Sequence, residues 1–160
     1  MPASWFEIEC GAILSSMKPL PHIYRVHLAG GTGQYATLAA TGLPELQGAP
    51  PEDFDGPGDA WSPEHLLLAA VESCFLFTFQ AISRASRLAF VSLDVSGEGI
   101  VDRKDGVMRF SAIVLRPRLR LATGDERERA MRILEKSEHA CLVSASLSTP
   151  IRLEPEIVID

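Results

Sequence analysis

The sequence lacks an excess of basic residues. Its 160 residues hold 15 Lys and Arg against 21 Asp and Glu, for a formal net charge of −6 at pH 7. Nucleic acids and anionic membrane surfaces are bound through a basic footprint, so the composition argues against both as general partners. A long uninterrupted apolar run is also lacking, because Glu72, Thr78 and Gln80 break the longest one, and we expect no transmembrane segment. Residues 1–18 carry acidic residues and no basic n-region, so we expect no signal peptide.

Cysteine is scarce and its number is odd, with Cys10, Cys74 and Cys141. An odd count in a chain of this length favours a reducing compartment. We therefore expect a cytoplasmic protein in which any disulfide is transient and catalytic rather than structural. His65 and His139 have no metal-ligand spacing with the cysteines, so the sequence predicts neither a zinc site nor a bound cofactor.

The patterns that are present indicate one domain over residues 1–160. Residues 1–20 form an extension of unclear role. Two stretches of strand composition, 22–30 and 33–41, flank GGTG and predict a hairpin. Residues 42–61 hold four prolines and four glycines, which predicts a long loop, and long loops in compact domains are often functional.

The clearest signal is a long apolar helix. Ser62 is a good N-cap, Pro63 suits the first helical position, and the carboxylate of Glu64 complements the positive end of the helix. The following residues are apolar on nearly all sides until the sequence turns polar and basic near Arg87. A helix of this kind is buried in the centre of a fold, and in a chain this small it also fits an obligate dimer.

Asp105-Gly106 predicts the turn of a long hairpin between strands at 90–102 and 106–122. Pro117 suggests that the second strand lies at a sheet edge or carries a bulge. On the alternating positions of this strand stand three arginines, which form either a solvated face or a site for an acidic ligand: Arg116, Arg118 and Arg120.

Thr123 and Glu126 have the spacing of a capping box, which predicts a second helix that ends near His139. Residues 150–160 have the composition of a final strand. The order of strand pair, loop, buried helix, hairpin, helix and strand predicts an α+β fold with helices packed on antiparallel sheets.

Cys74 lies in the middle of the apolar helix, where it is either an inert packing residue or a thiol placed for chemistry. Its neighbours alone favour packing, since apolar burial raises a thiol pKa and mid-helix positions gain little from the helix dipole. A second thiol, Cys141, would permit a peroxidase cycle through a sulfenic acid and a disulfide. Other readings stay open: Glu64 as a helix-end charge, Glu72 as a solvated or interface carboxylate, and Trp61 as a pocket wall or a staple at the helix entry.

Two stretches carry paired motifs, SPEHLLLAAVESCF and HACLVSASL. The first resembles the central-helix motif N-P-E-x-L-x-x-A-x-x-x-C-F of the OsmC/Ohr family (osmotically induced and organic hydroperoxide resistance proteins), and the second resembles that family's C-P-V-S-x-A-L. LPEL, before the loop rich in glycine and proline, is similar to the Ohr branch. The matching positions are Pro63, Glu64, Leu66 or Leu67, Ala69 or Ala70, Cys74, Phe75, Cys141, Val143, Ser144 and Leu147.

The resemblance implies an OsmC-like fold, with antiparallel sheets around a long buried central helix, in an intertwined homodimer. It further implies a thiol-dependent peroxidase for organic hydroperoxides, in which Cys74 is peroxidatic, Cys141 is resolving and Glu64 helps to position an arginine. The implied reductant is a dithiol donor such as a lipoylated protein. Glu64 and Cys74 are about 15 Å apart along a straight helix, so Glu64 serves the thiol only if the helix kinks or the chains pair.

The sequence departs from the family pattern at the arginine. Thr32 stands where the Ohr branch has it, residues 42–61 contain none, and Arg25 is the only arginine before Cys74. Leu142 also replaces the proline that usually follows the second cysteine. A second hypothesis is therefore an OsmC-like protein without efficient peroxidase activity, which binds a small ligand or senses the thiol redox state.

Overall fold

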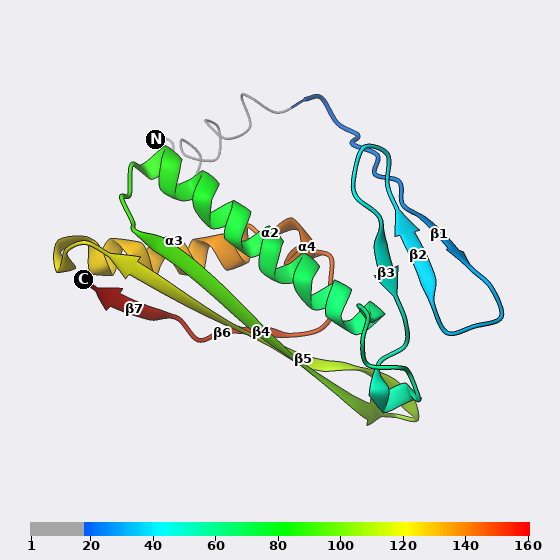
Figure 1. The fold of residues 1–160 in the computed structure, drawn as a ribbon. Coiled ribbons are helices and arrows are strands. Elements are labelled where there is room, and N and C mark those ends of the chain that lie inside the picture. The colour runs from blue at the N-terminus through cyan, green and yellow to red at the C-terminus, as the bar shows by residue number, and fades with distance from the viewer. Residues whose placement is uncertain (1–17) are drawn as a thin grey trace. The chain divides into compact units, whose positions relative to one another are not determined.

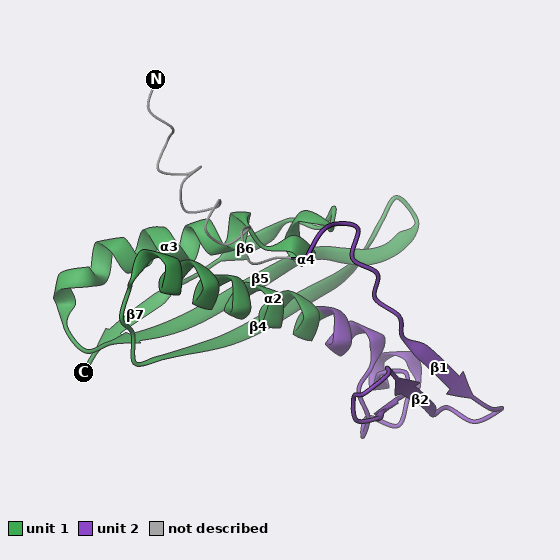
Figure 2. Cartoon of the chain, turned by 90° about the horizontal axis from the view of Figure 1, so that it is seen from above, with its two compact units in different colours: residues 1–17, 68–160 green, residues 18–67 purple. Residues whose placement is uncertain are grey.

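The computed structural model describes residues 18–160, which form two compact units (Figure 2). The smaller unit comprises residues 18–67, and the larger unit comprises residues 68–160. The predictions for Cys10 and for most of the N-terminal extension lie outside the described residues. The longest helix, α2 (Pro63–Ser86), begins in the smaller unit and continues in the larger one.

The smaller unit is built on an antiparallel sheet in the order β1-β2-β3. The hairpin around GGTG is confirmed, with shorter strands than predicted. The loop predicted at 42–61 is only partly a loop, because it contains a strand and a 3-10 turn. The elements are β1 (His27–Gly30), β2 (Ala36–Ala39), β3 (Leu46–Gly48) and η1 (Glu52–Phe54).

Hydrogen bonds hold residues 42–61 in a defined conformation beside the β1–β2 hairpin. The N–H of Ala49 donates to the carbonyl of Trp61 at 3.0 Å, which continues the sheet with a parallel bridge. The Tyr35 hydroxyl donates to the Asp59 carboxylate at 3.0 Å. These bonds give partners to polar groups in a segment whose composition predicted an irregular loop.

The larger unit contains a mixed sheet in the order β4-β5-β6, with β7 also paired to β5. The predicted hairpin between β4 and β5 is confirmed. Asp105 and Gly106 both have positive φ, 52° and 79°, as a two-residue type I′ turn requires. The strands are β4 (Ser92–Lys104), β5 (Val107–Leu121), β6 (Ile151–Leu153) and β7 (Glu156–Ile159).

Two predictions about these strands are wrong. The C-terminal segment forms two strands, and both pair parallel to β5, because the intervening helices carry the chain back across the sheet. Pro117 lies in a central strand, since β5 is paired on both sides. It is tolerated there because β6 pairs only as far as Leu115 and β7 starts its pairing at Arg118. The β4–β5 irregularity lies instead between Ile100 and Val101.

The second helix ends at His139 as predicted, but the capping box is not formed. Thr123 precedes a 3-10 turn, η2 (Gly124–Glu126), and makes no side-chain cap hydrogen bond. The helix proper is α3 (Arg127–His139), and one further turn follows as α4 (Leu142–Ala145). In the larger unit α2 and α3 lie on one face of the sheet (Figure 1), and apolar residues of both helices share one core with β5 and β7.

Local hydrogen bonds fix both ends of α2. At the start, the N–H of His65 donates to the hydroxyl of Ser62 at 3.2 Å, which confirms the predicted N-cap. At the end, Arg87 adopts a φ of 57° and the N–H of Leu88 donates to the carbonyl of Ser83 at 2.9 Å. This is the pattern of a Schellman cap, with arginine in the place that glycine usually takes.

Within this chain α2 is not buried on all sides as predicted. Its buried apolar residues recur at helical spacing on the face toward the sheet: Val71, Phe75, Phe79 and Ile82. On the opposite face Ala70, Ser73 and Phe77 are exposed, Phe77 to 64%. Among the described residues, α2 is also the one helix long and apolar enough to cross a membrane. That is weak support for such a role, because core helices of water-soluble proteins pass the same test.

Candidate functional site

The two cysteines of the paired motifs lie beside each other in the larger unit. Cys74 projects from α2 at the border between its buried and exposed faces and is partly exposed. Cys141 lies two residues after the end of α3, immediately precedes α4, and is completely buried. Both are free thiols, and the side chain of Cys74 lies close enough to that of Cys141 to raise its pKa. The fold therefore brings together two thiols that are far apart in sequence.

The two thiols differ in their surroundings. Burial raises the pKa of Cys141 above its ordinary value of 9.0 and is the largest effect on it. The hydroxyl and the backbone N–H of Ser144 lower this pKa, whereas the neighbouring Cys74 raises it further. With its pKa raised overall, Cys141 is a protonated thiol at neutral pH.

Ser144 is a site residue that the sequence reasoning matched to a motif without giving it a role. It lies three residues after Cys141, at the third position of α4. Its hydroxyl oxygen is buried and has no hydrogen-bond partner of good geometry among the described residues. The group beside it is the Cys141 sulfur, so the contact is a loose one in the reduced protein. The sequence signal for this role is the spacing of three residues between Cys141 and Ser144. In a helix that starts directly after Cys141, the N–H of Ser144 points toward the Cys141 side chain.

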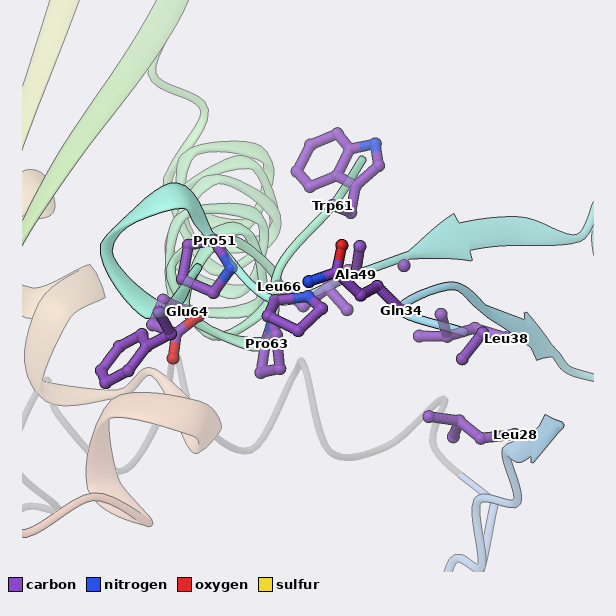
Figure 3. Close-up of a pocket in the computed structure, with 13 residues that line it drawn as sticks. Leu28, Gln34, Leu38, Ala49, Pro51, Trp61, Pro63, Glu64 and Leu66 are labelled. Carbon is purple, nitrogen blue, oxygen red and sulfur yellow. The ribbon is translucent and has the colours of Figure 1, made fainter. Parts of the chain in front are cut away.

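The smaller unit carries an apolar cavity of about 450 Å³ that is open to the surface (Figure 3). Residues of the β1–β2 hairpin, of the segment 48–61 and of the first turn of α2 form its walls. Gln34 supplies a side-chain amide to the lining, and Glu64 supplies a carboxylate. The lining residues are Leu28, Gln34, Ala36, Leu38, Gly48, Ala49, Pro50, Pro51, Phe54, Trp61, Pro63, Glu64 and Leu66.

Glu64 holds one carboxylate oxygen, Oε2, in a buried position without a hydrogen-bond partner among residues 18–160. Buried carboxylate oxygens are normally satisfied, so this atom is available to a ligand or to another chain. Trp61 lines the cavity, which supports its reading as a pocket wall, and its ring also meets that of His65 edge to face. Thr32 does not line the cavity, whereas Gln34 of the same hairpin does.

Glu72 stands apart from the thiol pair although it is close in sequence. The Gly97 backbone N–H donates to its carboxylate, and a Cβ added at position 97 would lie 2.3 Å from Glu72 Oε1. Burial raises the pKa of Glu72, and the Gly97 hydrogen bond opposes this. Glu72 thus packs α2 against β4 and is not freely solvated, which was one of the two readings, solvated or interface carboxylate, that the sequence left open.

The arginine row on β5 is neutralised by its neighbours. Each arginine meets at least one carboxylate from β4 or from the C-terminal segment 154–160. This supports a solvated, ion-paired face and leaves no free cation in the row for an acidic ligand. The pairs are Arg116 with Glu98 and Glu154, Arg118 with Glu156, and Arg120 with Asp160. Within the described part of the chain, no three His, Cys, Asp or Glu side chains are grouped as metal ligands.

Comparison with known families decides the relationship. The family model described as OsmC-like protein matches residues 56–156, which include Glu64, Cys74 and Cys141. The chain belongs to the OsmC-like family. It is also 31% identical over 109 residues to the uncharacterized protein YmaD of Bacillus subtilis, a match that covers 66% of this chain and 73% of YmaD.

Solved structures of OsmC-like proteins share the fold. An OsmC-like protein of unknown function from Vibrio cholerae superposes with a TM-score of 0.77 at 15% identity, over 84% of this chain and 99% of that one. An organic hydroperoxide resistance protein OsmC from Legionella pneumophila gives a TM-score of 0.67 at 18% identity, over 86% and 98%. These matches confirm the predicted α+β, OsmC-like fold.

Proposed function

We propose that this OsmC-like protein is a thiol-dependent peroxidase that reduces organic hydroperoxides, such as alkyl or lipid hydroperoxides, through a two-cysteine cycle. The observation that carries the proposal is the thiol pair itself. A partly exposed Cys74 lies against a buried Cys141. The exposed member can meet an oxidant, and the buried member can reach only its neighbour.

The chemistry balances with these two residues. The Cys74 thiolate attacks one oxygen of the hydroperoxide, the O–O bond breaks, and the leaving alkoxide takes a proton to become an alcohol. Cys74 is then a sulfenic acid. Cys141 attacks its sulfur, water leaves, and a disulfide joins the two residues. A dithiol donor, for which a lipoylated protein is the class that the family suggests, reduces the disulfide and is itself oxidised.

A preference for hydrophobic hydroperoxides is supported by the apolar character of both units. On α2, Val71 lies three residues before Cys74, one helical turn away, and Phe75 and Leu76 follow it directly. The cavity of the smaller unit is lined almost entirely by apolar side chains and offers the unpartnered oxygen of Glu64. In this proposal Glu64 helps to position the cation that serves the thiol. Because Thr32 stands where the Ohr branch has its arginine, another residue supplies this cation.

We further propose that the protein is an intertwined homodimer, in which a second copy covers the outward face of α2. A largely apolar helix that exposes Phe77 to 64% is unusual on a surface in contact with water. Further exposed apolar residues stand at the tip of the β4–β5 hairpin, namely Ile100, Val101, Val107 and Met108. A reducing, cytoplasmic setting is part of the same proposal, because the cycle needs free thiols.

The decisive experiment is a peroxidase assay with cumene hydroperoxide and dihydrolipoamide. Wild-type protein should turn over, Cys74→Ser should lose all turnover, and Cys141→Ser should accumulate a sulfenic acid after one equivalent of peroxide. Cys10→Ser serves as the matched control and should retain activity. No turnover in the wild type, with Cys74 unreactive toward alkylation at neutral pH, would sink the proposal.

The second candidate is a small-ligand-binding protein or thiol sensor without efficient peroxidase activity. The observations that favour it are the cavity of about 450 Å³ and threonine in the place of the family's arginine. Saturable quenching of Trp61 fluorescence by an apolar ligand, in a protein that shows no turnover, would favour this candidate. A matched Trp61→Phe variant would identify the signal.

A further inference from the structure

The two thiols differ in exposure, and this difference determines how a disulfide between them would be reduced. The inference rests on the proposed two-cysteine cycle. Cys74 is partly exposed on α2, whereas Cys141 has no exposed surface. A thiol–disulfide exchange starts when an incoming thiolate reaches one sulfur in line with the S–S bond. Access therefore singles out the Cys74 sulfur as the one that a reductant can attack.

The chain around Cys141 holds that sulfur in a defined position. The N–H of Cys141 donates to the carbonyl of Glu138 at 3.2 Å, and its carbonyl accepts the N–H of Ala145 at 2.9 Å. The residue is thus tied to the end of α3 and to the only turn of α4. Its backbone has extended φ and ψ of −69° and 116°, the conformation of a residue that begins a helix.

Ser144 places two donors near the same sulfur. Its backbone N–H and its hydroxyl both lower the pKa of the Cys141 thiol. In the reduced protein the hydroxyl oxygen is buried and has no hydrogen-bond partner among the described residues, and the Cys141 side chain accepts no capping hydrogen bond. Sulfur in a thiol or disulfide accepts hydrogen bonds weakly, so the loose contact of the reduced protein is expected. A thiolate accepts them strongly, and the same two donors gain energy when negative charge develops on Cys141.

We propose that Ser144 is a positioning residue that makes Cys141 the leaving group of the disulfide, so that the reductant attacks Cys74 and forms its mixed disulfide there. The hydroxyl oxygen is buried and not engaged elsewhere in the described chain, so it can turn toward a developing anion on Cys141 without the entry of water. Exposure thus decides which sulfur is attacked, and Ser144 decides how readily the other sulfur departs.

The step balances in atoms and electrons. A thiolate of the dithiol donor attacks the Cys74 sulfur, the Cys74–Cys141 bond breaks, and its electron pair stays on Cys141, which then takes a proton. The second thiolate of the donor attacks the donor's own sulfur in the mixed disulfide, and Cys74 leaves as a thiolate. The donor becomes a cyclic disulfide, and the protein gains two electrons.

The test uses a disulfide made with diamide, so it does not depend on peroxidase activity. The oxidised full-length protein is reduced with dithiothreitol, and the release of thiols is followed over time. We expect Ser144→Ala to slow reduction by roughly three- to tenfold, because the leaving thiolate loses one donor. The matched control is Ser146→Ala in the same turn, whose hydroxyl donates instead to the carbonyl of Leu142 at 2.8 Å and is exposed. This variant should be reduced at the wild-type rate.

A second readout separates stabilisation of the thiolate from a general loss of structure. In a Cys74→Ser background, the ultraviolet absorbance of the Cys141 thiolate is titrated with pH. Ser144→Ala should move the transition to higher pH, and Ser144→Thr, which keeps the hydroxyl, should restore it toward the parent. A merely structural role for Ser144 would leave no such rescue by the hydroxyl.

The site of attack is mapped with a monothiol. Brief treatment of the diamide-oxidised protein with 2-mercaptoethanol, an acid quench and peptide mass analysis should find the adduct on Cys74 and a free Cys141. An adduct on Cys141, or equal reduction rates for Ser144→Ala and Ser146→Ala, would overturn the inference, and so would failure of diamide to join the cysteines. A protein that forms and reduces this disulfide as described but does not turn over cumene hydroperoxide would contradict only the proposed peroxidase activity.

Discussion

The two faces of α2 have similar composition and opposite surroundings. On one face Val71, Phe75 and Phe79 are completely buried against the sheet and α3. On the other, Ala70, Ser73 and Phe77 are exposed in the single chain. An apolar residue on a helix is therefore not by itself a sign of burial in its own chain, and the same helix can serve one core and one interface.

Two ionisable side chains, Glu72 and Cys74, lie at the borders between these faces. Residues that follow each other on a helix point about 100° apart, so positions 72 and 74 flank the exposed Ser73 on opposite sides. Both are of intermediate burial. Glu72 is held by the N–H of Gly97, and Cys74 lies beside Cys141. The buried face thus fixes the helix, and its border presents the thiol.

The largest expected effect comes from removing a ring from the buried face. Phe75→Ala should lower the free energy of unfolding by about 3–5 kcal/mol at every protein concentration, because it opens a cavity in the core. Phe77→Ala is the matched variant on the exposed face and should cost less than about 1 kcal/mol in a dilute, monomeric sample. Urea unfolding followed by circular dichroism measures both.

Concentration gives the control for this pair. If the outward face is covered by a second copy, the loss caused by Phe77→Ala should grow as protein concentration rises, whereas that of Phe75→Ala should stay constant. Equal losses for the two variants in dilute samples would contradict the division of α2 into a core face and a free face.

A charge on the outward face should have the next largest effect. Phe77→Asp places a carboxylate where we propose that another chain packs, and burial of an unpaired charge is costly. We expect sedimentation to show a monomer, with the secondary structure retained. Val91→Asp changes another exposed apolar residue, outside α2, and should remain dimeric. A wild-type protein that is monomeric, or a dimeric Phe77→Asp, would rule out this interface.

Local sequence signals predicted the parts of this fold that local interactions determine. Ser62 and Pro63 marked the start of α2, and Asp105-Gly106 marked the β4–β5 turn, because capping and turn geometry depend on a few adjacent residues. The paired cysteine motifs indicated the family, which the match over residues 56–156 confirms. The roles of Cys74, Cys141 and Glu64 stay predictions.

Features that depend on distant partners could not be predicted in this way. Pro117 suggested an edge strand, since nothing near it shows that β6 and β7 leave a gap on one side. The apolar pattern of α2 predicted burial without saying which chain provides it. The cavity in the smaller unit and the proximity of Cys74 to Cys141 arise only when segments meet in space.

The smallest expected effect concerns Glu72, at the border opposite Cys74. Burial raises the pKa of this carboxyl above its ordinary 4.5, so the folded chain binds the proton more tightly than the unfolded one. Its contribution to stability is therefore greatest when Glu72 is protonated and declines as pH rises from 4.5 through the raised pKa.

Glu72→Gln keeps an acceptor for the Gly97 N–H and removes the charge. We expect its melting temperature to exceed that of the wild type by up to about 2 °C at neutral pH. The difference should vanish at pH values below 4.5. Glu135→Gln, on an exposed position of α3, is the matched control and should leave the melting temperature at neutral pH close to that of the wild type. A Glu72→Gln variant that is less stable than the wild type at neutral pH would show that the charged carboxylate strengthens the contact between α2 and β4.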